Sequence, residues 1–379
     1  MKKPLILILL PLYFPSSKAG GAATAIRNLM ESVSQEYDFE IVTSDQSQDN
    51  KEPQPRSNSI DDSNCAEPRV HYLPSGILAI KRLLEILKSR SFHKVYINSF
   101  FSIRFCLIPV LLSYFLPKTP FLISPRGELL PNILRLHYSL SKRIYLFFVQ
   151  ILGLYRNTQF IASSNEEMTS IDSQLLSKKP TALLMDIITT NYAYLPFANN
   201  LSKPKLIYIS RIETNKGLDV LIQALKLLKR HVCLDIYGPI INLKYWEYCM
   251  KLVSEDTYTD INYRGIARSE DINRLFASSE LFVFPTHGES NGYVITEAIS
   301  SGCIVITSKH VPWSSILPKT MLVVAAGDTP RDYAQCLAEY LDLSSAERFR
   351  IRSLIHSQSA NMFKEINSYS LRVLDSMLA

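Results

Sequence analysis

Short apolar runs alternate with helical patterns along all 379 residues of the chain. The runs are rich in β-branched and aromatic side chains, and they predict strands at 5–10, 39–43, 70–73, 95–97, 121–123, 159–162, 205–209, 233–237, 261–264, 281–285, 303–307 and 321–324. Between them, apolar residues recur at helical spacing, as at Leu218, Leu221, Ile222, Leu225 and Leu228. Strands that alternate with helices predict α/β domains whose parallel sheets are covered on both faces.

Polar breaks in this pattern suggest how the chain divides. The segment 45–67 is polar, contains Pro53 and Pro55, and predicts a long surface loop. A second break at 199–204 precedes a new strand, and the length suits two domains. We therefore expect an N-terminal Rossmann-like domain over 1–198, a second over 199–355, and a C-terminal helix over 356–379 that could pack back on the first domain.

Composition narrows the class of protein. Hydrophobic residues make up 47% and charged residues 20%, as in a globular protein with a full core. The six cysteines include no C-x-x-C pair, so we expect reduced thiols in a cytoplasmic protein and no structural metal. The run 4–14, between Lys2-Lys3 and Gly20-Gly21, resembles a short signal peptide, but a buried first strand is the reading we favour.

Positive charge is concentrated in the first half of the chain. The net charge is +6, and residues 1–200 hold 21 Lys and Arg against 16 Asp and Glu. Scattered solvated lysines explain this as well as a surface that meets an anionic partner. No basic stripe accompanies a nucleic-acid-binding module, so nucleic acid is not an expected partner.

Two segments of the second half predict an anion-binding site. Arg211 ends a strand and Lys216-Gly217 precedes a helix, so both cations should lie beyond the carboxyl end of the sheet, where doubly wound folds bind ligands. There they could neutralise a diphosphate, although a pair of exposed loop cations is the alternative. In the first half, Gly20-Gly21 occupies a similar strand-to-helix turn, or simply joins the two elements.

The segment 287–298 carries the strongest signal. Glu289 follows a strand, Asn291-Gly292-Tyr293 opens a helix, and Glu297 lies in its second turn. The carboxylates can accept hydrogen bonds from sugar and ribose hydroxyls, and the amides between them suit phosphate. An exposed Glu and a Glu–Lys helix pair would be the alternative.

Glu289 and Glu297, with seven residues between them and Ala298 following, resemble the E-x7-E motif of retaining glycosyltransferase family 4, within the glycosyl transferases group 1. Ser210-Arg211 to Lys216-Gly217 looks like that family's diphosphate-binding segment. The turns at Tyr237-Gly238 and at 263–266 look like its nucleotide-facing turns. The resemblance covers 205–324, and more weakly the first half. It implies the GT-B fold, two Rossmann-like domains facing across a cleft, with metal-independent, retaining sugar transfer from a UDP- or GDP-sugar.

The resemblance also implies roles for individual residues. Arg211 and Lys216 would stabilise the departing diphosphate, Glu289 the charge that develops on the sugar, and Glu297 would hold the ribose. Gly21, Gly238, Asn291, Gly292 and Tyr293 would line the donor site, with Ile266 near the base. Ser290-Asn291 departs from the family's usual residues there, which leaves the donor sugar open.

On the acceptor side, Arg126 stands where many relatives carry a His, and Glu128 follows it. Arginine stays protonated, so it is a poor general base. In a front-face mechanism the leaving phosphate could instead accept the proton. A structural salt bridge is the alternative role for Arg126.

The segment 141–150 is basic at its start and heavily aromatic. Such a helix could rest on the inner membrane surface, where a lipid-linked acceptor is presented, although a buried helix is the more common explanation. The segment 78–90, with Lys81, Arg82, Lys88 and Arg90, is a similar candidate. The sequence therefore predicts a cytoplasmic transferase of cell-surface polysaccharide assembly (O-antigen, lipopolysaccharide, capsule or exopolysaccharide), which could be peripheral at the inner face of the membrane.

Two other classes of function remain open from the sequence. A sugar-nucleotide epimerase or a phosphorylase on the same plan would also bind nucleotide or phosphate. An exported sugar-binding protein would need the N-terminal run to be a cleaved signal.

Overall fold

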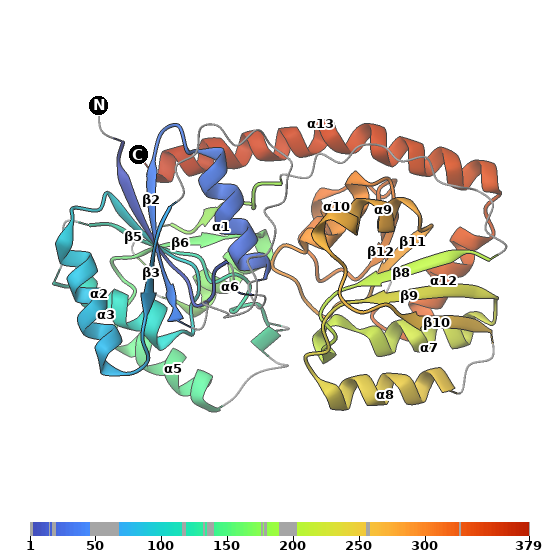
Figure 1. The fold of residues 1–379 in the computed structure, drawn as a ribbon, viewed down its shortest axis with the longest axis horizontal. Coiled ribbons are helices and arrows are strands. Elements are labelled where there is room, and N and C mark those ends of the chain that lie inside the picture. The colour runs from blue at the N-terminus through green and yellow to red at the C-terminus, as the bar shows by residue number, and fades with distance from the viewer. Residues whose placement is uncertain are drawn as a thin grey trace. The chain divides into compact units, whose positions relative to one another are not determined.

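The computed structural model describes residues 3–14, 16, 20–45, 68–115, 119–131, 133–134, 140–175, 177, 180–188, 203–254, 258–325 and 327–378. The predicted loop at 45–67, except for Asp45, and residues 199–202 of the predicted break at 199–204 lie outside these residues. The chain forms two compact units (Figure 1). Unit 1 comprises Met1–Ile187 with Ile366–Ala379, and unit 2 comprises Ile188–Glu365.

Unit 1 is built on a parallel sheet, which in the described residues has seven strands in the order β3-β2-β1-β4-β5-β6-β7. Its strands are β1 (Leu5–Leu9), β2 (Asp38–Ser44), β3 (Arg69–Leu73), β4 (Lys94–Ile97), β5 (Phe121–Ile123), β6 (Gln159–Ala162) and β7 (Ala182–Leu183). Sequence order reverses between β1 and β4, which makes that junction the topological switch point of the sheet.

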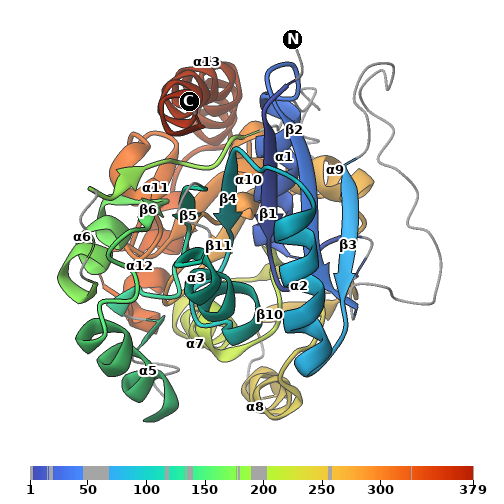
Figure 2. The same ribbon diagram turned by 90° about the vertical axis from the view of Figure 1, so that its left-hand side faces the viewer.

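Helices cover both faces of this sheet (Figures 1 and 2). The helical segments are α1 (Gly21–Ser32), α2 (Ile77–Ser89), η2 (Ile103–Leu107), α3 (Ile108–Ser113), α5 (Leu140–Ile151) and α6 (Asn165–Gln174). Leu7 and Leu9 of β1 point into a core shared with α2, α3 and α5, whereas Ile6 and Ile8 point into a core shared with α1. The strand period of two thus divides the apolar residues between two helix layers.

Unit 2 repeats the plan with strands in the order β10-β9-β8-β11-β12-β13, all parallel. The strands are β8 (Lys205–Ile209), β9 (Val232–Tyr237), β10 (Thr259–Tyr263), β11 (Leu281–Phe284), β12 (Ile304–Thr307) and β13 (Leu322–Val324). The switch point lies between β8 and β11. These are the strands that precede the two motifs of the second half.

The helical segments of unit 2 are η3 (Thr214–Lys216), α7 (Leu218–Leu228), α8 (Leu243–Ser254), η4 (Ser269–Asp271), α9 (Ile272–Ala277), α10 (Tyr293–Ser300), α11 (Trp313–Ile316) and α12 (Pro330–Leu341). A final long helix, α13, runs over Ser345–Leu378. Its last turns belong to unit 1, where Leu374, Met377 and Leu378 join the core beneath α1. The unit boundary at 365/366 therefore lies inside one continuous helix, ten residues beyond the expected boundary at 355.

The predicted class, α/β with two doubly wound Rossmann-like domains, is confirmed. Each predicted strand is present to within two residues at either end, and the first apolar run is β1. The sequence pattern misses β7, which has only two residues. Of the cysteines, those in the described residues are free, and Cys106, Cys249 and Cys303 are buried.

Candidate functional site

The two motifs of the second half meet at the switch point of unit 2. Lys216 follows β8 and Glu289 follows β11, and these strands are neighbours in the sheet. The Lys216 ammonium and the Glu289 carboxylate form an ion pair across the junction, with side chains only 7% and 17% exposed. A cation and an anion from separate loops are therefore joined at the edge where doubly wound sheets bind ligands.

Two glycines allow the loops at this edge to approach each other. A Cβ on Gly217 would lie 2.0 Å from the Pro285 carbonyl oxygen, and one on Gly238 would lie 1.8 Å from the Ser210 carbonyl oxygen. Both residues also have positive φ. Only glycine can occupy these positions without moving the neighbouring backbone.

Hydrogen bonds hold the Lys216 and Glu289 loops in register. The Asn215 carbonyl accepts from the His287 amide at 2.9 Å and from the Thr286 hydroxyl at 3.1 Å. The Glu289 amide donates to the His310 carbonyl at 3.1 Å. Because both loops are bonded to each other and to the segment after β12, the ion pair is held by a rigid frame rather than by flexible side chains alone.

Arg211 lies on the same loop as Lys216, but its side chain is 58% exposed. Its guanidinium pairs with Glu213 at 2.9 Å rather than with Glu289. The structure therefore does not bring Arg211 into the Lys216–Glu289 pair. It leaves the cation at the surface of the loop, where an exchange of partners costs little.

Glu297 lies in the second turn of α10, and burial raises the pKa of its carboxyl to about 7. Among the described residues, no cation or hydrogen-bond donor is paired with this carboxylate. Burial of a carboxylate without a partner is unfavourable, and a bound group with hydroxyl donors would relieve it. The role expected of Glu297 in holding the ribose stays a prediction.

The turn between the two glutamates ends in a glycine with left-handed backbone. Gly292 has φ 72° and ψ 58° and caps the N-terminus of α10, while Asn291 is buried and Tyr293 is the first helical residue. A Cβ on Gly292 would meet Ile295 at 3.2 Å and Glu289 at 3.6 Å. This turn places the amides of the helix start directly after Glu289.

The predicted nucleotide-facing turns also end strands of unit 2. The Gly238 amide donates to the Gly265 carbonyl at 2.8 Å, and the Tyr263 hydroxyl donates to the Gly238 carbonyl at 2.9 Å. Ile266 beyond them is 70% exposed. The turns after β9 and β10 are therefore joined, and the apolar side chain that follows them is exposed.

In unit 1, the structure places Arg126 in a buried ion pair. Its guanidinium, 9% exposed, pairs with Asp186 and donates to Asn98 and, at 3.3 Å, to the Tyr96 hydroxyl. Its backbone has φ 56°, unusual for a residue with a side chain. This arrangement is the structural salt bridge that the sequence left open as an alternative to acceptor binding.

Glu128 is likewise occupied by its own chain. Its carboxylate accepts from the Phe101 amide at 2.7 Å, the Phe100 amide at 3.2 Å and the Ser99 hydroxyl at 3.0 Å. Burial raises its pKa, and these hydrogen bonds oppose the shift. Glu128 therefore anchors the loop after β4, and direct contact with an acceptor would have to replace these bonds.

Glu167, which the sequence reasoning missed, holds the same turn from the opposite side. It is fully buried and accepts from the Gly127 amide at 2.5 Å, the Ser163 amide at 2.8 Å and the Ser163 hydroxyl at 2.6 Å. Nothing local marks it, because an acidic residue in a first helical turn is ordinary. Its partner Gly127 lies 40 positions away.

Gly20 and Gly21 start α1 at the switch point of unit 1. Gly20 is the N-cap, with extended backbone, and a Cβ there would meet nothing within 4 Å. The Asn98 side-chain amide donates to the Ala22 carbonyl at 3.2 Å, which joins this turn to the end of β4. Unlike Gly217 and Gly238, Gly20 could carry a side chain without meeting the neighbouring backbone.

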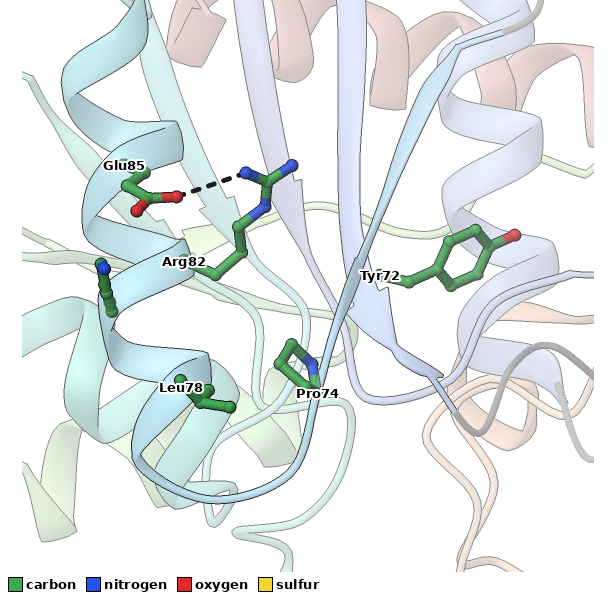
Figure 3. Close-up of a pocket in the computed structure, with 6 residues that line it drawn as sticks. Tyr72, Pro74, Leu78, Arg82 and Glu85 are labelled. Atoms are coloured by element: carbon green, nitrogen blue, oxygen red, sulfur yellow. Dashed lines mark hydrogen bonds and ion pairs between the residues drawn. The ribbon is translucent and has the colours of Figure 1, made fainter.

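A shallow groove in unit 1 is separate from these residues (Figure 3). It lies between β3 and α2 and is lined by Tyr72, Pro74, Leu78, Lys81, Arg82 and Glu85, with a volume of about 320 Å³. Arg82 and Glu85 pair across one turn of α2 at 3.2 Å. None of the residues predicted for the donor or acceptor site lines this groove, whereas Leu78, Lys81 and Arg82 belong to the segment 78–90 that the sequence predicts as a candidate for membrane contact.

Most of unit 2 resembles known glycosyl transferases in sequence. Residues 203–342 match the family model of the glycosyl transferases group 1. The O-antigen chain mannosyltransferase B of Escherichia coli is 27% identical over 172 residues, 44% of this chain, and the chain spans 45% of that relative's length. The predicted resemblance to the glycosyl transferases group 1 is thus confirmed.

Solved structures share the fold at low identity. HepE of Anabaena, solved in complex with UDP and glucose, has a TM-score of 0.71 at 15% identity, with 98% of this chain and 100% of that chain covered. WaaG, a glycosyltransferase involved in lipopolysaccharide biosynthesis, has a TM-score of 0.64 at 13% identity, with 97% and 99% covered. At such identities the likeness establishes the fold alone.

Proposed function

We propose, from the match of residues 203–342 to the glycosyl transferases group 1, that this chain transfers a sugar from a UDP- or GDP-sugar to a glycan or lipid-linked acceptor. The observation that carries the proposal is the buried Lys216–Glu289 ion pair at the switch point of unit 2. A diphosphate can replace Glu289 as the partner of Lys216. The exchange would free the carboxylate to face the sugar.

In this proposal the leaving group is neutralised by side chains of the protein. Lys216 is fixed by its frame, and Arg211 can turn from Glu213 to the phosphates at little cost. Positive groups placed where negative charge develops are a large source of rate enhancement. With two cations available, no bound metal is part of the proposal.

Glu289 and Glu297 would act on the donor in different ways. The freed Glu289 carboxylate would stabilise positive charge at the anomeric carbon, and Glu297 would accept hydrogen bonds from the ribose. The bond from the anomeric carbon to the diphosphate breaks, and the acceptor oxygen bonds to the same face. The acceptor proton passes to the departing diphosphate oxygen. Retention is the expectation that the E-x7-E resemblance brings.

The acceptor is proposed from the relatives. The Escherichia coli relative is an O-antigen chain mannosyltransferase, and WaaG is involved in lipopolysaccharide biosynthesis. We therefore propose a cell-surface polysaccharide or glycolipid as acceptor, and mannose as the first donor sugar to test. Ser290-Asn291, within the turn between the glutamates, is the segment expected to select among donor sugars.

The test is a product assay with labelled UDP- and GDP-sugars, with and without a glycan acceptor. Transfer that requires the acceptor and is lost in Glu289→Ala supports the proposal. Conversion of the donor sugar without acceptor would indicate an epimerase, and release of a sugar phosphate that requires added phosphate would indicate a phosphorylase. Full transfer by Glu289→Ala would contradict the assigned site.

A further inference from the structure

The helix layer formed by α2, α3 and α5 in unit 1 has an unusual outer face. Among the described residues of unit 1, every exposed large apolar side chain except Tyr369 belongs to these helices, to η2, or to the residues that directly follow α3 and α5. They are Ile77, Leu78, Ile103, Leu111, Tyr114, Phe115, Leu140, Ile144, Phe147, Phe148, Ile151 and Leu152. Monomeric soluble proteins seldom gather exposed apolar residues in this way.

The helix α5 carries the centre of this surface. Leu140, Ile144, Phe147, Phe148 and Ile151 follow the i, i+4, i+7, i+8, i+11 spacing of one helix face, and they are 47% to 71% exposed. Only Leu146 and Val149 are buried. The buried-helix alternative is therefore wrong, because α5 turns most of its apolar side chains away from the core.

The end of α3 extends the apolar face of α5. The Tyr114 hydroxyl donates to the Leu154 carbonyl at 3.0 Å, which ties the two helix ends together. Phe115, next to it, is 81% exposed. Figure 2 shows α3 and α5 in the same layer of unit 1. We call the exposed side chains of α5 with Leu111 and Phe115 the apolar face.

The positive charge near α5 favours an anionic partner over a second copy of the chain. Residues 136–165, which include α5, contain Lys142, Arg143 and Arg156 and no acidic residue. Arg143, in the first turn of α5, and Arg156, five residues after its end, are exposed. A symmetric dimer through this face would bring like charges together, whereas an anionic surface would neutralise them.

We propose that the apolar face docks on an anionic lipid bilayer, with α5 lying along the interface between headgroups and acyl chains. Aromatic and aliphatic residues flanked by arginines are the composition of interfacial helices. Among the described residues, no helix is sufficiently long and apolar to cross a bilayer, so contact would be peripheral there. The inference extends the proposed function, since a lipid-linked acceptor would be presented at this surface.

The test measures co-sedimentation of the full chain with vesicles of phosphatidylcholine and phosphatidylglycerol, and with phosphatidylcholine alone. We expect binding to the mixed vesicles that weakens with added salt. Phe147→Ser with Phe148→Ser should reduce the affinity about tenfold or more. Leu227→Ser with Phe349→Ser, a pair of similarly exposed residues in unit 2, should leave it unchanged.

The electrostatic part is tested by Arg143→Glu, which should weaken binding at least about fivefold, with the melting temperature measured beside it to check the fold. Absence of wild-type binding to mixed vesicles, or equal binding by the double Phe variant, would overturn the inference. A wild-type dimer that the Phe variant converts to a monomer, with no vesicle binding, would identify a self-interface instead. The vesicle assay needs neither donor nor acceptor. If the chain binds vesicles but no nucleotide-sugar donor, the proposed function is refuted and the docking surface is not.

Discussion

Charged side chains lie at the carboxyl edge of both sheets. The two edges differ in how far these side chains are paired within the chain. In unit 1, Arg126 is enclosed by Asp186, Asn98 and Tyr96, and Glu128 accepts three hydrogen bonds from the loop after β4. These groups satisfy one another within the chain. A ligand would have to break several internal bonds to reach them.

In unit 2 the groups at the edge are only partly satisfied. Lys216 forms an ion pair with Glu289, and Arg211 forms one at the surface with Glu213. Burial raises the pKa of the Glu297 carboxyl. A Cβ on Gly217 or Gly238 would lie 2.0 Å or 1.8 Å from a backbone carbonyl oxygen, whereas a Cβ on Gly20 in unit 1 would meet nothing within 4 Å. The comparison teaches that one architecture can use the same edge for internal stability in one unit and leave it available to a ligand in the other.

The largest expected effect comes from the glycines of unit 2. Gly217→Ala or Gly238→Ala would place a methyl group on a neighbouring carbonyl oxygen, so the loops must move. We expect each to lower the free energy of unfolding by about 3 kcal/mol or more, measured by denaturant unfolding. Gly20→Ala is the matched control in unit 1 and should change it little. A normal unfolding midpoint for Gly217→Ala would show that the frame is not rigid.

Loss of Lys216 should act on catalysis. Lys216→Ala removes the cation at the switch point, and we expect kcat/KM for donor transfer to fall by about 10²–10³-fold with the protein still folded. Lys216→Arg, which keeps the charge, should recover part of the rate. The measurement is steady-state kinetics beside circular dichroism. A wild-type rate in Lys216→Ala would remove the residue from the site.

Loss of Arg126 should act on stability. Arg126→Ala leaves Asp186 buried without its cation, and we expect the free energy of unfolding to fall by about 3 kcal/mol. Double replacement, Arg126→Met with Asp186→Leu, should restore much of the loss. If Arg126→Ala instead unfolds like wild type and raises only the KM for acceptor, the residue belongs to an acceptor site after all.

The pH dependence of stability should report Glu297. Its pKa is raised above the unfolded value, to about 7, so the ionised form is disfavoured by folding. The protein therefore loses stability from this group as pH rises from about 4.5 to 7. Relative to Glu297→Gln, wild type should lose about 3 kcal/mol over that range, measured by denaturant unfolding at several pH values. Parallel curves for the two proteins would contradict the shift.

Arg211 should give the smallest effect. Its exposed pair with Glu213 contributes little to stability, so Arg211→Ala should leave the melting temperature unchanged. We expect a fall in kcat/KM of about tenfold, since Lys216 remains to neutralise the diphosphate. A loss as large as that of Lys216→Ala would mean that Arg211 turns fully into the site when donor binds.

Sequence predicted the strands because buried parallel strands are continuous apolar runs. It also predicted Lys216 and Glu289, since the ends of neighbouring parallel strands meet at one edge. It could not predict that Asp186, 60 positions from Arg126, is its partner, because no local pattern encodes such a contact. It also could not predict which side of α5 is buried, because apolar residues occur all round this helix.

We propose above all that the edge of unit 2 binds a nucleotide diphosphate through Lys216. The most direct test of this proposal is titration calorimetry of UDP and GDP with wild type and with Lys216→Ala. We predict that one of the nucleotides binds wild type and that the variant binds it at least about tenfold more weakly. Equal affinity of the two proteins for both nucleotides, or no binding of either nucleotide by wild type, would contradict the account.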